Sequence, residues 1–240
     1  MAKQKTDQQI TDPAKLLLLE VVNLHPGNVK SIINANPNLA REKPSGADRS
    51  YLMELCNLVI TLDGDNIYIS STQPGASELI KTPVKIEDIH GKTYSEKMSV
   101  TDVIRSKMHE IAHLLIKAGV DVTEIVDGLS ALDMAKANVF MDRAAEVIQN
   151  ALNKCLRAAV ENGSEEDLNR CLKAGADPET KDSRNQPLDQ RASNLGYENI
   201  AALLQSAVLA KRAGVDSRTI PTGQNGGTNQ PGLKKQSPTT

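Results

Sequence analysis

A five-residue phrase that occurs three times limits the possible folds of this chain more than any other feature. The three copies are residues 117–121 (KAGVD), 173–177 (KAGAD) and 212–216 (RAGVD). Each copy places a cation where it meets the negative end of a helix, followed by a glycine that is free to take the left-handed conformation of a helix cap. The phrase therefore predicts three helices, each ending at the glycine of its copy.

An amphipathic pattern precedes two of the copies and completes a repeating unit. Apolar residues recur at helical spacing, namely Ile111, Leu114, Leu115 and Ala118 before the first copy and Leu168, Cys171, Leu172 and Ala174 before the second. A further short helix is predicted at residues 154–160, and Ser164 with Asp167 has the pattern of a capping box that begins the next one. The unit is a helix, a tight turn, a second helix and a glycine stop.

This unit resembles the ankyrin repeat, whose pattern is a polar turn, a Thr-Pro-Leu-His-like helix start, a second helix and a Gly-Ala-Asp ending. Residues 127–136 (DGLSALDMAK) carry this pattern, and residues 182–189 (DSRNQPLD) with 196–204 (GYENIAALL) carry it again. The resemblance covers residues 14–38, which keep only the helix-turn-helix rhythm, and residues 100–214. It implies an all-α fold, an α-solenoid in which ankyrin-like helix-turn-helix repeats stack, with an inserted loop or β-hairpin.

The spacing of the units departs from the period of about 33 residues that an ankyrin array keeps. Gly119 and Gly175 are 56 residues apart, and the helix predicted near residues 143–152 runs almost directly into the next one, without room for a hairpin loop. Gly175 and Gly214 are 39 residues apart. The second interval predicts an elongated last helix that caps the end of the stack.

Residues 61–98 form the largest irregularity, and we expect them to be an insertion between a helix at residues 51–59 and one at residues 101–118. Apolar and polar residues alternate on both sides of the turn sequence at residues 63–66 (DGDN), which predicts a β-hairpin. The predicted domains are a disordered N-terminus (1–13), an irregular ankyrin-repeat domain (14–216) that contains this insertion, and a disordered tail (217–240) rich in Gly, Pro, Ser, Thr and Asn.

His109, Glu110 and His113 match the H-E-x-x-H motif, which places two imidazoles one helical turn apart beside a glutamate that serves as general base for zinc-bound water. At about 100° per residue, both histidines lie opposite the apolar stripe of their predicted helix. The metzincin continuation of this motif would need a glycine at position 116 and a histidine, the third zinc ligand, at position 119, but this chain has Ile116 and Gly119 there. We therefore predict no metal site, no cofactor and no catalysis, and keep a zinc metallopeptidase that uses the motif as the alternative.

The resemblance implies a protein-protein interaction module, because an ankyrin stack presents its loop tips and the concave face of its first helices to another protein. The residues expected to bind the partner are charged or polar and lie in predicted loop tips or on first helices: Glu124, Asp127, Lys136, Asp182, Arg184, Asn185 and Arg191. Degenerate arrays with basic tails are also similar to proteins that intracellular bacteria secrete into host cells. Such secretion is the alternative to a cytoplasmic location.

Composition argues against several other classes of function. A net charge of −2 does not favour a nucleic-acid partner, and 2% aromatic residues leave little for base stacking. No apolar run reaches the ~18 residues of a membrane-spanning helix, and we expect no secretory signal. The three cysteines, Cys56, Cys155 and Cys171, lack CxxC spacing, so we expect a reducing compartment and assign Cys155 and Cys171 to the core.

Overall fold

The computed structural model describes residues 12–44, 47–63, 66–70, 84–85 and 99–215. The helices in this part of the chain are α1 (Pro13–Val22), α2 (Pro26–Ala35), the 3-10 helix η1 (Leu39–Arg41), α3 (Tyr51–Cys56), α6 (Val100–Lys117), α7 (Ala131–Ala137), α8 (Asp142–Asn162), α9 (Glu165–Lys173), α10 (Leu188–Asn194) and α11 (Glu198–Arg212). The strands are β1 (Val59–Asp63), β2 (Asn66–Ser70) and β3 (Val84–Lys85) in one antiparallel sheet, and β4 (Ile125–Val126) and β5 (Leu129–Ser130) in another. The described fold is mostly helical, as predicted, with two small hairpins.

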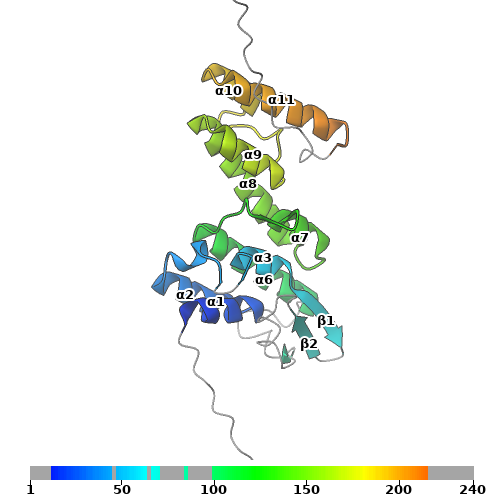
Figure 1. The fold of residues 1–240 in the computed structure, drawn as a ribbon. Coiled ribbons are helices and arrows are strands. Elements are labelled where there is room, and N and C mark those ends of the chain that lie inside the picture. Colours follow the sequence, from blue (N-terminus) through cyan, green and yellow to red (C-terminus); the bar gives the residue numbers. More distant parts are fainter. Residues whose placement is uncertain (1–11, 45–46, 64–65, 71–83, 86–98, 216–240) are drawn as a thin grey trace, which may run out of the picture.

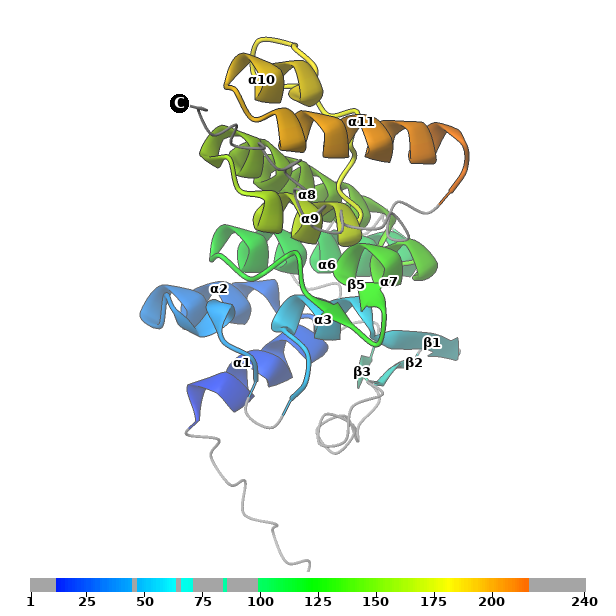
Figure 2. The same cartoon turned by 45° about the horizontal axis from the view of Figure 1, so that its top comes forward.

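The helices form consecutive pairs that follow one another along the molecule. α1 packs on α2, α3 on α6, α7 on α8, α8 on α9 and α10 on α11. We call the two members of each pair its first and second helix, in chain order. The first helices of neighbouring pairs contact each other, α1 with α3 and α3 with α7, and so do the second helices, α2 with α6 and α6 with α8. Figures 1 and 2 show the result, a layered molecule with α1 and α2 at one end and α10 and α11 at the other. Each layer buries its apolar side against the next.

Helix α8 joins two successive pairs as a single helix of 21 residues. It contacts α6 and α7, which precede it in the chain, and α9 and α10, which follow it. Figure 1 shows α8 in the middle of the molecule, between α7 and α9. The predicted lack of room for a hairpin loop is thus confirmed, but the separate short helix expected at residues 154–160 is wrong. Residues 142–162 contain no Gly and no Pro, so nothing in this segment stops the helix.

The repeated phrase ends a helix in all three of its copies, as predicted. Gly119, Gly175 and Gly214 lie two positions after the last residues of α6, α9 and α11, with φ of +91°, +97° and +70°. A residue with a Cβ is strained at these angles, so glycine closes each helix without that cost. The last helix, α11, has 15 residues, which is longer than α9 with 9 residues but shorter than α6 with 18, so its predicted elongation holds only relative to α9.

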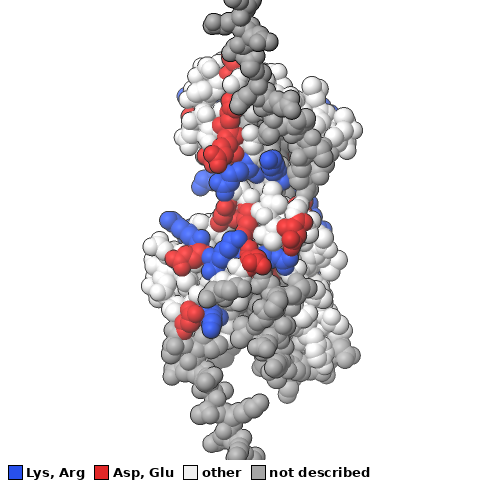
Figure 3. Space-filling model, in the orientation of Figure 1, with Lys and Arg blue, Asp and Glu red and all other residues white. Residues whose placement is uncertain are grey.

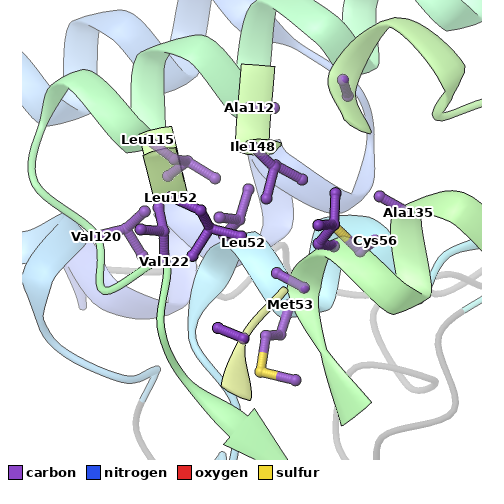
Figure 4. Close-up of a cluster of buried hydrophobic side chains, with 14 of the residues drawn as sticks. Leu52, Met53, Cys56, Ala112, Leu115, Val120, Val122, Ala135, Ile148 and Leu152 are labelled. Carbon is purple, nitrogen blue, oxygen red and sulfur yellow. The ribbon is translucent and has the colours of Figure 1, made fainter. Parts of the chain in front are cut away.

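An aliphatic core holds the layers together. Leu52 and Met53 of α3, Leu115 of α6, and Ile148 and Leu152 of α8 are completely buried. Figure 4 shows these side chains converging from three helices, together with apolar residues of the loop that follows α6. Burial of one large aliphatic side chain stabilises a fold by about 1.5–3 kcal/mol. The cluster therefore fixes α8 against α3 and α6.

The predicted β-hairpin of the insertion is confirmed over its described residues. β1 pairs antiparallel with β2, starting from Val59 opposite Ser70. The central turn residues 64–65 lie outside the described part of the chain. The helix expected over residues 51–59 is shorter than predicted, since α3 ends at Cys56 and Val59 already begins β1. β-branched residues in this segment favour a strand over another turn of helix.

Much of the predicted insertion and both predicted disordered segments lie outside the described residues. Within residues 61–98 the structure describes only 61–63, 66–70 and 84–85, and residues 1–11 and 216–240 are also outside it. α1 begins at Pro13 with Asp12 as its N-cap, one residue inside the segment predicted to be disordered. Of the helices in the described ranges, none combines the length and the apolar character needed to cross a membrane.

Candidate protein-interaction surface

Two exposed turns carry four of the predicted binding residues, and the first is Asp127-Gly128 between β4 and β5. Both residues have positive φ, +54° and +78°, which is typical of a two-residue hairpin turn. The Asp127 side chain is 79% exposed and its carboxylate lies 3.5 Å from the Arg49 guanidinium. Ser130 and Asp133 then begin α7 with a reciprocal capping box. The hairpin therefore presents a charged tip directly before a first helix.

The second turn spans residues 182–186 and precedes α10. The Asp182 carboxylate accepts hydrogen bonds from the backbone N–H groups of Gln186 and Arg184, both at 2.8 Å, and these bonds hold the pKa of Asp182 below its usual value. Asn185 has a φ of +63°, which asparagine tolerates better than most residues. Asp182 thus shapes the turn, whereas Arg184 and Asn185 are exposed at its tip.

Two other predicted binding residues connect elements of this chain to one another. Glu124 forms an ion pair with Lys43 at 2.7 Å and accepts a hydrogen bond from the Ser50 N–H at 2.9 Å, and its side chain is only 10% exposed. Arg191 donates two hydrogen bonds of 2.8 Å to the Glu161 carboxylate, and this contact lowers the pKa of Glu161. Glu124 thus holds the segment before α3, and Arg191 holds α10 against α8.

Lys136, the remaining predicted residue, is exposed at the rim of a hollow of about 450 Å³, here termed the junction groove. α7, the middle of α8, the loop after α9 and the end of α11 line this groove through Leu132, Asp133, Lys136, Gln149, residues 175–178, Lys211, Gly214 and Val215. The Gln149 side chain, which lines the groove, donates to the Gly175 carbonyl at 3.0 Å. One helical turn further along α8, the Asn153 side-chain oxygen accepts from the Asp177 N–H at 2.8 Å. These bonds hold the loop after α9 along the middle of α8.

Ion pairs fix the far wall of the junction groove. Lys211 lies 2.7 Å from Asp177 and 2.9 Å from Glu179, and Arg212 lies 2.9 Å from Glu179. Hydrogen bonds from Lys211 and Arg212 lower the pKa of the Glu179 carboxyl. Figure 3 shows acidic and basic side chains interspersed over the middle of one face of the molecule. A surface with both signs of charge favours a partner that also carries both.

A second hollow, of about 460 Å³, lies between α7 and β1 and was not predicted from the sequence. Its lining is mostly apolar and consists of residues 56–60, Leu129, Asp133, Met134 and residues 137–140. Val59, Leu129 and Val139 are 52%, 48% and 71% exposed, and grouped exposed aliphatic side chains often mark interaction sites. The walls come from segments far apart in the chain, so no local pattern could have revealed this groove.

His109 and His113 lie on α6 away from its buried stripe, as helical geometry predicts. His113 is exposed and His109 is half-buried, whereas Ile104, Met108 and Ile111 are completely buried. Within the ranges that the structure describes, no group of three or more His, Cys, Asp and Glu side chains is placed to hold a metal ion. The zinc-peptidase alternative thus stays a prediction without a ligand set among these residues.

Comparison of the chain with protein-family models, with curated proteins and with solved structures gives no match. The candidate surface is therefore defined by the geometry of this chain alone. It consists of two ordered turns with exposed charged or polar tips, a groove between α7 and the end of α11, and an apolar groove beside β1.

Proposed function

We propose that this chain is an ankyrin-type α-solenoid that binds another protein through its loop tips and the concave face of its first helices, without catalysis and without a cofactor. The observation that carries the proposal is the packing order. First helices α1, α3 and α7 contact one another in succession, as do second helices α2, α6 and α8. Ankyrin-type arrays bury their core between neighbouring repeats in this way, and they present the remaining surface to partners.

The continuity of α8 accounts for the irregular spacing within this array. In a regular ankyrin array, the chain leaves a second helix through a hairpin before the next first helix begins. Here α8 supplies both helices, and no hairpin separates them. The junction groove lies beside α7, where that hairpin would project. A segment of a partner protein that enters the groove meets Lys136 at the rim and the Lys211 ion pairs on the opposite wall.

The proposal includes a cytoplasmic location, with secretion into a host cell as the alternative. Three free cysteines and the absence of a CxxC pair support a reducing compartment. The net charge of −2 supports a protein partner over a nucleic acid.

Site-specific photocrosslinking in the native cells tests the proposed binding face. A photoreactive amino acid at Lys136 or at Arg184 is expected to form a covalent adduct with the same partner protein, because both positions are exposed beside the proposed contact surface. The matched controls are Lys117 and Glu166, which are also exposed but belong to the second helices α6 and α9. Adducts at the controls, with none at Lys136 and Arg184, would overturn the proposal.

A further inference from the structure

The outer edge of strand β1 has no neighbouring strand among the described residues. The sheet runs in the order β1, β2, β3, so β1 is paired on one side only. Figure 2 shows the β1–β2 hairpin projecting from the side of the molecule, with β2 on one side of β1 and α7 near the other. An edge of this kind presents a row of backbone N–H and C=O groups with which another strand can pair.

Two carbonyl contacts show which backbone groups face this outer edge. The Val59 carbonyl faces β2, where it accepts a hydrogen bond of 3.5 Å from a serine hydroxyl. The Leu58 carbonyl, one residue earlier, accepts a hydrogen bond of 2.9 Å from the Asn138 side chain, which lies on the side away from β2. Successive residues in an antiparallel strand point their backbone groups to alternate sides. The N–H and C=O groups of Ile60 and Leu62 therefore face the outer edge.

The outer edge lacks the features that protect exposed strands from pairing. Residues 58–62 (LVITL) contain no charged residue, no proline and no glycine, and β1 pairs with β2 over five residues in unbroken register. Exposed edges in natural proteins are commonly protected by lysine, proline or a bulge.

Exposed apolar side chains gather around the same edge. Eight large apolar side chains are exposed in the described ranges, and five of them lie on β1, β2, β5 or the loop between α7 and α8: Val59, Leu62, Tyr68, Leu129 and Val139. A group of exposed apolar side chains is typical of an interaction surface. Together with the outward backbone groups, it indicates that the edge binds an extended, apolar strand.

We propose that two copies of this chain form a closed dimer in which β1 of one copy pairs antiparallel with β1 of the other, about a two-fold axis at Thr61. This register places Ile60 of each copy opposite Leu62 of the other, so the residues that face the edge exchange their backbone hydrogen bonds. Thr61 lies opposite Thr61 of the second copy. Both copies use the same edge, so the contact closes at two chains.

The charge and the surroundings of β1 favour a second copy as the occupant of this edge. Residues 58–62 are uncharged, so the two-fold axis brings no like charges together along them. Ile60 lines the apolar groove between α7 and β1. Leu62 is 43% exposed in a single chain, and in the dimer it lies beside Ile60 of the other copy, since directly opposite residues point to the same face. The strand thus supplies both the apolar side chain and the groove that receives it.

Sedimentation equilibrium of the full chain over a range of micromolar concentrations tests the dimer. We expect the average mass to rise with concentration from 25.9 kDa towards twice this value and no further. Leu62→Pro should raise the dissociation constant of the dimer about tenfold or more, because it removes an outward backbone N–H from both copies and leaves the N–H groups that face β2 in place. Leu209→Ala, at an exposed leucine of α11, is the control and should leave the dimer unchanged.

A cysteine at the axis gives a second test, which does not depend on whether the hairpin tolerates proline. Thr61→Cys is made in a Cys155→Ser background, because the other two native cysteines are buried. Mild oxidation should link two chains through residue 61, since the Cα atoms at such an axis lie about 4.5 Å apart, within the range of a disulfide. Val59→Cys in the same background is the control, because its two copies lie four residues apart along the paired strands, about 13 Å.

Four results would overturn the proposal. They are a mass that stays at 25.9 kDa at every concentration, a mass that rises beyond two chains, a dimer that Thr61→Cys does not link, and equal linkage of Thr61→Cys and Val59→Cys. Hydrogen exchange that protects the Ile60 and Leu62 amides of a single chain only when a different protein is bound would also overturn it, because the edge would then pair with a strand of that protein.

Discussion

Replacing Asn153 by proline in the middle of α8 is expected to lower the free energy of unfolding by about 4 kcal/mol. Proline removes a backbone N–H donor and clashes with the carbonyl four residues earlier, which costs about 3 kcal/mol in a helix interior. The change also removes the side-chain oxygen that accepts the Asp177 N–H at 2.8 Å, a loss of about 1 kcal/mol. Urea-induced unfolding followed by circular dichroism measures the difference.

Asn153→Ala is the matched control, because alanine keeps the helix and removes only the hydrogen bonds of the side chain. It is expected to cost about 1 kcal/mol. If residues 143–152 and 154–160 were separate helices joined by a loop at Asn153, proline and alanine would destabilise the chain by similar amounts. That result would contradict the continuous helix.

Truncating Leu152 to alanine is expected to lower the free energy of unfolding by about 3 kcal/mol. The Leu152 side chain is completely buried where α8 meets α3 and α6 (Figure 4), so its removal loses apolar burial and leaves a cavity. The same change at Leu209 of α11, which is 67% exposed, is the control and should cost less than about 0.5 kcal/mol. Chemical unfolding of both variants provides the comparison. Equal losses would mean that the layers are not packed through α8 as described.

The features that were predicted correctly depend on residues close together in the chain. The glycines of the repeated phrase end their helices because a left-handed residue after a cation closes a helix by local geometry alone. The hairpin of β1 and β2 follows from alternation around a short turn. The missing loop between the two parts of α8 was visible as a spacing, but the spacing did not reveal that one helix fills it.

The features that were missed depend on partners far away in the chain. Glu124 looks like an exposed charge in a polar loop, and only the fold brings Lys43 and the Ser50 N–H to it. Arg191 likewise reaches Glu161 across two helices.

Two triple variants with equal change in net charge test most directly whether the tips and first helices bind a partner. One combines Asp127→Asn, Lys136→Ala and Arg184→Ala, where asparagine preserves the positive φ of the tip. The other changes exposed residues of second helices and combines Lys117→Ala, Glu166→Ala and Lys173→Ala. Both should unfold at the urea concentration of the wild type, since exposed substitutions change stability by less than about 0.5 kcal/mol each.

Quantitative mass spectrometry of proteins captured from native cells compares these two variants with the wild type. We expect that at least one protein is captured equally by the wild type and by the second-helix variant, and that its capture falls about tenfold or more with the tip variant. Capture of every such protein by the tip variant at the wild-type level, or equal loss from both variants, would contradict it.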